Sequence, residues 1–283
     1  MIFSELLHKK KKDIDRILIS FFEQAQKNQN HHQDLLLTIL LARFNKENEQ
    51  HEFYNLKKNS FFVESTQHEF FSTYHDTSVD YYKKIHPHLK NQKEFYEYMQ
   101  LTQSENDIKL EEMSIQIELM IYLKIWETRA FIRRLVQIFN LQEAKNFNWD
   151  LKIDYASTEL KMISNKTQKT ELQELIKDIY KSSLRNAIAH SEFFIENRKI
   201  YLTNLPKDIE QIKTDYSFEE WAILYHSTAL LYKKFLESVE SYYDFYVKLA
   251  NDKELYFLDR SKKQQKIIFV DKQWKLTLEI LLL

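Results

Sequence analysis

Three polar residues near the end of a predicted helix, Arg185, Asn186 and His190, have side chains suited to acid–base chemistry on a phosphate. The imidazole of histidine titrates near neutral pH, so it takes up or releases a proton there. The guanidinium of arginine keeps its charge and binds two phosphate oxygens with donors in a fixed fork. An asparagine side chain holds a histidine tautomer or donates to a phosphate. RNA carries its own nucleophile, the 2′-hydroxyl, and cleavage without a metal needs a base, an acid and a cation.

The spacing of these residues follows from the helix that carries them. Apolar residues recur every three or four positions from Leu172 to Ile188, which predicts one amphipathic helix with a single buried stripe. Asn186 and His190 are four positions apart and therefore lie on one face, with Arg185 rotated by about 100° from Asn186. After the helix, two short β-prone runs surround a turn predicted at residues 196–198.

This arrangement resembles the HEPN family (higher eukaryotes and prokaryotes nucleotide-binding domain). In that family an Arg, commonly followed by a polar residue such as Asn, is separated by four to six residues from a His near a helix end. Here the motif is Arg185-Asn186-Ala187-Ile188-Ala189-His190, and the resemblance covers roughly residues 106–249, about half of the chain.

The resemblance implies a metal-independent endoribonuclease with Arg185, Asn186 and His190 as catalytic residues. It implies a homodimer in which the motif helices of two copies bring two Arg–His sets into one cleft. One His190 then acts as the base and the other helps the leaving group. It further implies a bacterial toxin or antiphage effector that cuts RNA and is restrained by an antitoxin partner, a sensor or its own N-terminal region.

Two interpretations from other classes remain open. The chain is then either a non-catalytic RNA- or nucleotide-binding module that keeps the motif, or a helical interaction protein whose aromatic N-terminal half docks a partner. A His at a helix end interacts well with the helix dipole, and a nearby Arg commonly makes a surface ion pair. Both residues therefore also have an ordinary structural explanation.

The 283-residue chain contains no glycine and no cysteine. The P-loop, the dinucleotide fingerprint and the nucleophile elbow need glycine, so these sites are excluded. Thiol nucleophiles, Cys-ligated zinc and disulfides are excluded by the absence of cysteine. With a net charge of −1, any RNA affinity must come from a local patch. We expect no cofactor, and we expect left-handed turn positions to fall on Asn or Asp.

The elements that must position the motif are mainly helical. We expect a mainly α, HEPN-like antiparallel helical bundle with a small β-turn or hairpin after the motif helix and a C-terminal β-hairpin. Residues 1–105 form an N-terminal helical region of unknown role, residues 106–250 a HEPN-like helical domain, and residues 251–283 a hairpin tail. Helices are predicted over residues 1–28, 34–44, 92–101, 110–140, 157–163 and 217–249, and hairpin strands over 266–270 and 274–281.

Local signals refine this outline. Thr170 with Gln173, and Ser217 with Glu220, predict capping boxes at two helix starts. Residues 113–119 alternate as a strand would, but the length of the apolar pattern favours a helix. Polar residues of the 110–140 helix, Glu127, Arg129, Arg133 and Arg134, either line the motif cleft or form a solvated face.

Metal and membrane functions are not expected. Seven of the ten His lie between residues 31 and 88, but without HExxH-type spacing, so scattered surface His is the preferred interpretation. Residues 1–7 are too short for the core of a secretory signal, and charged residues interrupt the most apolar run, residues 113–126. We expect a soluble, cytoplasmic protein.

Overall fold

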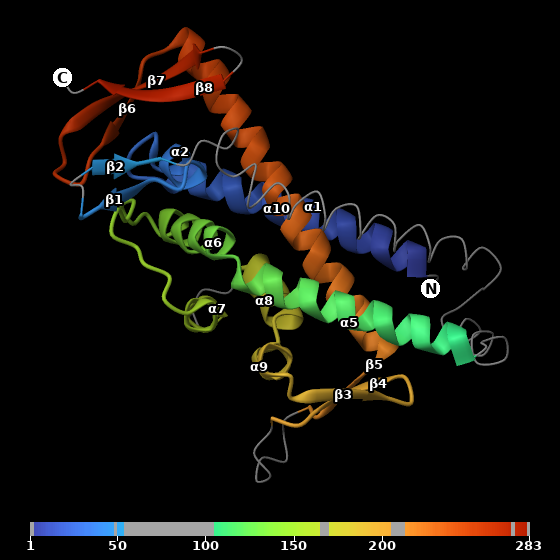
Figure 1. The fold of residues 1–283 in the computed structure, drawn as a ribbon. Coiled ribbons are helices and arrows are strands. Elements are labelled where there is room, and N and C mark those ends of the chain that lie inside the picture. The colour runs from blue at the N-terminus through green and yellow to red at the C-terminus, as the bar shows by residue number, and fades with distance from the viewer. Residues whose placement is uncertain are drawn as a thin grey trace. The chain divides into compact units, whose positions relative to one another are not determined.

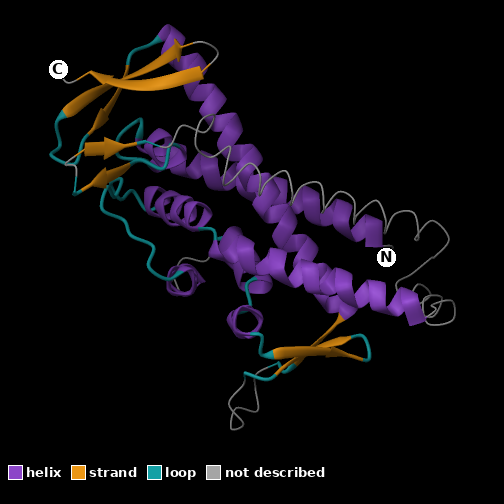
Figure 2. Ribbon diagram, viewed as in Figure 1, coloured by secondary structure: helices purple, strands orange, loops and turns teal. Residues whose placement is uncertain are grey.

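The computed structural model describes residues 3–47, 50–53, 105–164, 170–204, 213–272 and 275–281. The chain divides into two compact units. Unit 1 comprises residues 1–15, 71–128 and 167–232, and unit 2 comprises residues 16–70, 129–166 and 233–283. Helices α1 (Phe3–Asn28) and α10 (Phe218–Asp252) supply residues to both. The predicted mainly α class is confirmed (Figures 1 and 2).

Unit 1 contains the motif. Its further elements are α5 (Glu105–Glu127), α8 (Glu171–Ile179), α9 (Ser182–His190), β3 (Phe193–Glu196), β4 (Lys199–Leu202) and β5 (Asp215–Ser217). Helix α5 packs against α9, and the three strands form an antiparallel sheet in the order β3-β4-β5 (Figure 1). Aromatic side chains fill its core: Tyr122, Trp126, Trp221 and Tyr225 are at most 1% exposed. Burial of each such ring contributes about 2 kcal/mol.

Unit 2 is built around α6 (Arg129–Gln142), which packs against two shorter helices. Its other elements are α2 (Asp34–Ile39), α7 (Ala156–Ser164), β1 (Arg43–Asn45), β2 (Gln50–Glu52), β6 (Leu255–Leu258), β7 (Gln264–Lys272) and β8 (Lys275–Leu281). The rings of Phe22 and Phe131 pack on Phe235 with centroid distances of 5.4 and 5.0 Å. A two-stranded sheet, β1-β2, and a three-stranded sheet, β6-β7-β8, are both antiparallel.

Several local predictions are confirmed. In the first capping box the Thr170 hydroxyl accepts from the Gln173 N–H, and in the second the Ser217 hydroxyl accepts from the Glu220 N–H. The β3–β4 turn has two central residues, Asn197 and Arg198, with φ of 49° and 57°. Two positive φ values suit the type I′ turn that matches the twist of a hairpin. The C-terminal hairpin is β7–β8, and β6 extends it to three strands.

Three predicted helices differ from the structure in their limits. The expected helix over residues 110–140 is two helices, α5 and α6, which are interrupted at Thr128. The Thr128 hydroxyl donates to the Lys124 carbonyl, the back-bonding of a β-branched hydroxyl that disturbs a helix. The expected helix over residues 34–44 ends at Ile39, and Phe44 lies in β1. The motif helix is also two helices, α8 and α9, with Tyr180 and Lys181 between them.

The prediction that left-handed positions fall on Asn or Asp is wrong for most of them. Among the described residues, Asn197 agrees with it, but Leu41, Ala144, Ser191, Arg198 and Lys262 also have positive φ. Leu41, Ala144 and Ser191 follow the ends of α2, α6 and α9. At each end the left-handed residue donates to the carbonyl three positions earlier, and the next residue donates to the carbonyl five positions earlier. This is the Schellman pattern, in which the hydrogen bonds offset the cost of placing a Cβ where glycine is usual.

Some predictions fall outside the described residues. The helix predicted over residues 92–101 and the aromatic-rich stretch from residue 54 onward lie there, as do His68, His75, Asp76, His86 and His88. Among the helices that are described, none combines the length and the apolar character that a membrane span requires.

Candidate active site

Helix α9 brings the three predicted catalytic residues together on nine residues of backbone. Its apolar side chains, Leu184, Ala187 and Ile188, are buried in unit 1. Asn186 and His190 are exposed on the other side, and the Arg185 side chain is 21% exposed. The buried stripe thus determines which face of α9 carries the polar residues to solvent.

Arg185 has two defined partners. Its Nη2 donates to Glu127 Oε1 at 2.8 Å, and its Nη1 donates to Asn186 Oδ1 at 3.0 Å. A guanidinium has five N–H donors, so three remain for a ligand. Because the Asn186 oxygen is taken by Arg185, the Asn186 side chain offers its NH₂ donors to any further acceptor. No hydrogen bond joins Asn186 to His190 within the described part of the chain.

His190 is the last residue of α9, directly before the left-handed Ser191. Its imidazole makes no hydrogen bond or ion pair with any residue that the structure describes. Among the residues with a described position, neither ring nitrogen has a partner that would keep it from a substrate or a second chain. An exposed imidazole at a helix end can give a proton to a bound substrate or take one from it.

The junction between α8 and α9 is held by a hydroxyl from α5. Tyr122 is fully buried, and its Oη donates to the Ile179 carbonyl at 3.0 Å and accepts from the Lys181 N–H at 2.9 Å. The hydroxyl thus replaces helix hydrogen bonds that are lost where the two helices separate. Burial raises the pKa of the Tyr122 phenol far above its usual value, which keeps it a neutral donor.

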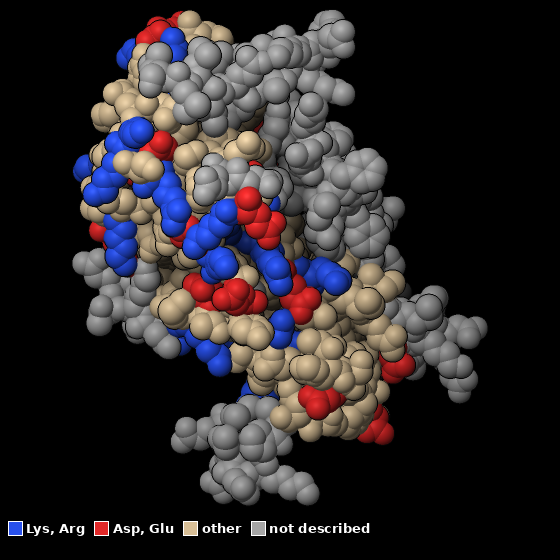
Figure 3. Space-filling model, turned by 60° about the vertical axis from the view of Figure 1, so that its left-hand side comes forward, with Lys and Arg blue, Asp and Glu red and all other residues tan. Residues whose placement is uncertain are grey.

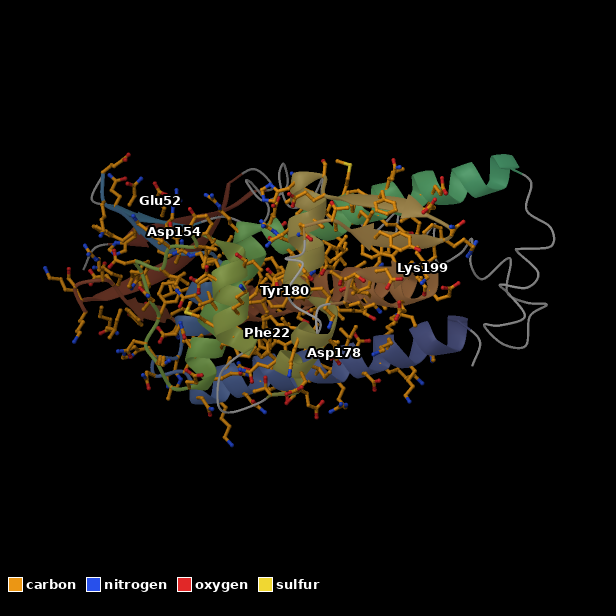
Figure 4. All side chains as sticks on the ribbon, turned by 90° about the horizontal axis from the view of Figure 1, so that it is seen from below. Phe22, Glu52, Asp154, Asp178, Tyr180 and Lys199 are labelled. Atoms are coloured by element: carbon orange, nitrogen blue, oxygen red, sulfur yellow. The ribbon has the colours of Figure 1, made fainter. Side chains whose placement is uncertain are left out.

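Aromatic packing fixes the same junction. The Trp126 ring meets the Tyr180 ring edge to face at a centroid distance of 5.1 Å. Burial raises the pKa of Tyr180 (labelled in Figure 4), against the smaller opposing effect of the Arg185 charge. The Trp221 indole donates to Glu118 Oε2 at 2.7 Å and ties α10 to α5 in this unit.

The segment after the hairpin holds the other end of α9. Asn204 Nδ2 donates to the Ser183 carbonyl at 3.0 Å in the first turn, and the Thr203 N–H donates to the Glu192 carbonyl at 2.9 Å just after the last. Helix α9 is therefore anchored at both ends, and its polar face is presented by a fixed backbone.

Of the charged residues predicted on the 110–140 helix, Glu127 contacts the motif. Arg133 and Arg134 lie on α6 in unit 2 and donate to backbone carbonyls near the end of α2: Arg133 to Ala42, and Arg134 to Ile39. These two arginines satisfy carbonyls that the short helix leaves without partners. Tyr122 was missed by the sequence reasoning, because a tyrosine in an apolar helix gives no local signal that its hydroxyl fixes a distant helix junction.

Neither sign of charge predominates in the chain, whose net charge is −1. On the face drawn in Figure 3, Lys and Arg side chains gather toward the centre with Asp and Glu side chains beside them. Within the described ranges, no group of three or more His, Asp or Glu side chains is arranged to hold a metal ion.

Comparisons with protein-family models, with curated proteins and with solved structures find no match to this chain. The residues of α9 and their surroundings in unit 1 are therefore the basis for inferring a function.

Proposed function

We propose that the chain is a metal-independent endoribonuclease of HEPN type. One observation carries the proposal: a single short helix presents Arg185, Asn186 and His190 on its solvent-facing side. The side chains of Arg185 and Asn186 are joined there by a hydrogen bond. The site supplies a permanent cation with spare donors, an amide donor and an exposed imidazole. These groups match the needs of phosphodiester cleavage through the RNA's own 2′-hydroxyl.

The proposed reaction is a transesterification. His190 takes the proton of the 2′-hydroxyl, the 2′-oxygen forms a bond to phosphorus, and the bond from phosphorus to the 5′-oxygen breaks. A second imidazole gives a proton to the departing 5′-oxygen. The products are a 2′,3′-cyclic phosphate and a 5′-hydroxyl end. Arg185 and the Asn186 amide donate to the phosphoryl oxygens as negative charge increases on them.

The single imidazole on the polar face of α9 supports a composite site. The mechanism uses an acid and a base, and α9 offers a single His, so we propose a homodimer in which two α9 helices face each other across the RNA. Ala189 is exposed beside His190 and leaves room for the approach of a second helix. Ala187, the other alanine of the motif, is buried within its own unit and does not contribute to this approach.

The experiment compares the wild type with His190→Ala and Arg185→Ala in the presence of EDTA. Purified protein is incubated with bacterial RNA, and new 5′-hydroxyl ends are counted. We expect cleavage by the wild type and a loss of at least about 100-fold in each variant, since acid–base help alone is worth about 10²–10⁴-fold. His32→Ala and Arg260→Ala change exposed residues of the same types in unit 2, outside the motif, and should cleave normally. Full cleavage by His190→Ala would refute the assignment.

Expression in bacteria tests the biological part of the proposal. A toxin or antiphage effector should arrest growth with degraded RNA, and His190→Ala should abolish both effects. An antitoxin or other regulatory partner is part of this proposal, and its coexpression should restore growth. Growth arrest with intact RNA would point to another target.

A non-catalytic function is the second candidate, and the Glu127–Arg185 ion pair favours it. A half-buried ion pair between two packed helices is also a common structural contact. A non-catalytic RNA- or nucleotide-binding module would bind RNA without cleaving it, and binding would weaken in Arg185→Ala. If the chain is a helical interaction protein, neither Arg185→Ala nor His190→Ala should change its activity in cells.

A further inference from the structure

We propose that Glu127 is a positioning residue for Arg185. Its carboxylate holds the guanidinium in the orientation in which the remaining donors receive the scissile phosphate. The inference rests on the proposed nuclease function and adds to it a residue from a different helix. Arg185 Nη2 donates to Glu127 Oε1 at 2.8 Å, and the two residues are 58 positions apart in the sequence.

The position of Glu127 is fixed by the end of its helix. Glu127 is the last residue of α5, and Thr128 closes the helix with its N–H donating to the Ile125 carbonyl and its hydroxyl to the Lys124 carbonyl. The preceding side chain, Trp126, is 1% exposed and packs on Tyr180. The carboxylate therefore extends from a backbone that has little freedom to move.

The register between α5 and α9 is fixed as well. One turn before Trp126, the buried Tyr122 hydroxyl forms hydrogen bonds with Ile179, at the end of α8, and with Lys181, directly before α9. The ion pair thus joins two groups whose backbones are already held together, so less conformational entropy is lost on pairing than between two mobile surface chains. The side chains of Arg185 and Glu127 are 21% and 33% exposed, which leaves the pair only partly screened by water.

Two fixed hydrogen bonds define the plane of the guanidinium. Nη2 is held by Glu127 and Nη1 by Asn186, so the planar group cannot rotate without breaking one of them. The three donors that remain then point in set directions. A misplacement of about 1 Å in such a group can cost on the order of 100-fold in rate, so an anchor for Arg185 should be visible in kcat.

The first experiment measures cleavage kinetics of Glu127→Ala and Glu127→Gln on bacterial RNA. We expect kcat to fall about 10- to 100-fold in Glu127→Ala, with a smaller fall in Glu127→Gln, whose amide oxygen still accepts from Nη2, and with little change in KM. The matched control is Asp215→Asn, which breaks another 2.8 Å ion pair in the same unit, with Lys199, and should cleave as the wild type does. Circular dichroism establishes that all variants are folded.

The second experiment separates positioning from a purely structural role. Guanidinium ion at millimolar concentration, well below denaturing levels, is added to Arg185→Ala and to the double variant Arg185→Ala/Glu127→Ala. We expect partial recovery of cleavage where Glu127 remains to hold the added ion, and none where it is missing. Equal recovery in both proteins would overturn the proposal.

Two further results would overturn it. Wild-type or faster cleavage by Glu127→Ala would mean that the carboxylate does not position Arg185, and faster cleavage would mean that it competes with the phosphate. In both cases Arg185→Ala and His190→Ala would still be inactive, and the nuclease proposal would stand. A wild type that does not cleave RNA would instead refute the nuclease proposal and this inference together.

Discussion

Replacement of Tyr122 by phenylalanine removes one oxygen atom from the junction between α8 and α9. In the wild type that oxygen donates to the Ile179 carbonyl and accepts from the Lys181 N–H, and the side chain is fully buried. Tyr122→Phe keeps the ring and its contacts with Trp126 and Trp221. The substitution therefore tests the two hydrogen bonds and little else.

The expected loss of stability follows from the two backbone groups that phenylalanine leaves without a hydrogen-bond partner. A buried polar group without a partner costs about 1–3 kcal/mol, and here two backbone groups lose theirs. The Tyr122 hydroxyl no longer has to be desolvated, which offsets part of this loss. We expect unit 1 to be destabilised by about 2–3 kcal/mol, and we expect kcat for RNA to fall because α9 carries Arg185 and His190.

The assay combines urea unfolding with amide hydrogen exchange. Unfolding gives the change in free energy, and exchange at the Lys181 amide reports the lost hydrogen bond directly, with a fall in protection of about 10-fold or more. Tyr155→Phe is the control, because Tyr155 is 74% exposed and should change stability by less than about 0.5 kcal/mol. If Tyr122→Phe matches this control and Lys181 keeps its protection, the junction is held by packing and not by the hydroxyl.

Three other predictions concern stability. Burial raises the pKa of Asp34 from 3.8 to about 6, so the folded state binds the proton more tightly and the Asp34 contribution to stability falls as pH rises from about 4 to about 6. Asp34→Asn should remove this pH dependence and stabilise the protein at pH 7 by up to about 3 kcal/mol, measured by unfolding at pH 5 and pH 7. Ala144→Gly should raise the melting temperature, since glycine avoids a left-handed cost of about 1–2 kcal/mol that exceeds its own entropic cost, and an unchanged or lower value would contradict this. Phe194→Ala removes a stacked cross-strand pair with Tyr201 at 4.9 Å and should cost no more than about 1 kcal/mol, while a larger loss in thermal unfolding would show that the ring supports more than the hairpin.

The sequence predicts those parts of the fold that residues a few positions apart determine. Thr170 and Gln173 form their capping box within one turn, and Asn197 lies in its turn, because partners a few positions apart carry the whole signal. The three motif residues were found together for the same reason. The apolar pattern continues from α8 into α9, because residues 172–179 and 184–188 are each amphipathic. The periodicity alone therefore does not indicate the junction between the two helices.

The remaining features depend on partners that are distant in the sequence. The break before α9 is fixed by Tyr122, 57 residues before Ile179, and the orientation of Arg185 by Glu127, 58 residues away. Hydroxyl and carboxylate side chains on an apolar helix do not indicate which distant group they will meet. The left-handed positions were mispredicted because tertiary structure and helix-end hydrogen bonds, rather than residue preference, select them at Leu41 and Ala144.

The left-handed Ser191 has a consequence for the imidazole next to it. Ser191 keeps its reversed backbone only while two N–H groups, its own and that of Glu192, remain bonded to α9. When thermal motion breaks these two hydrogen bonds, a right-handed conformation of Ser191 has the lower free energy. We expect the last turn of α9 to unwind as Ser191 changes to that conformation. His190 then moves while Arg185, tied to Glu127, stays in place. A helix end whose left-handed residue carries a conformational cost thus lies directly beside the group that we expect to carry protons.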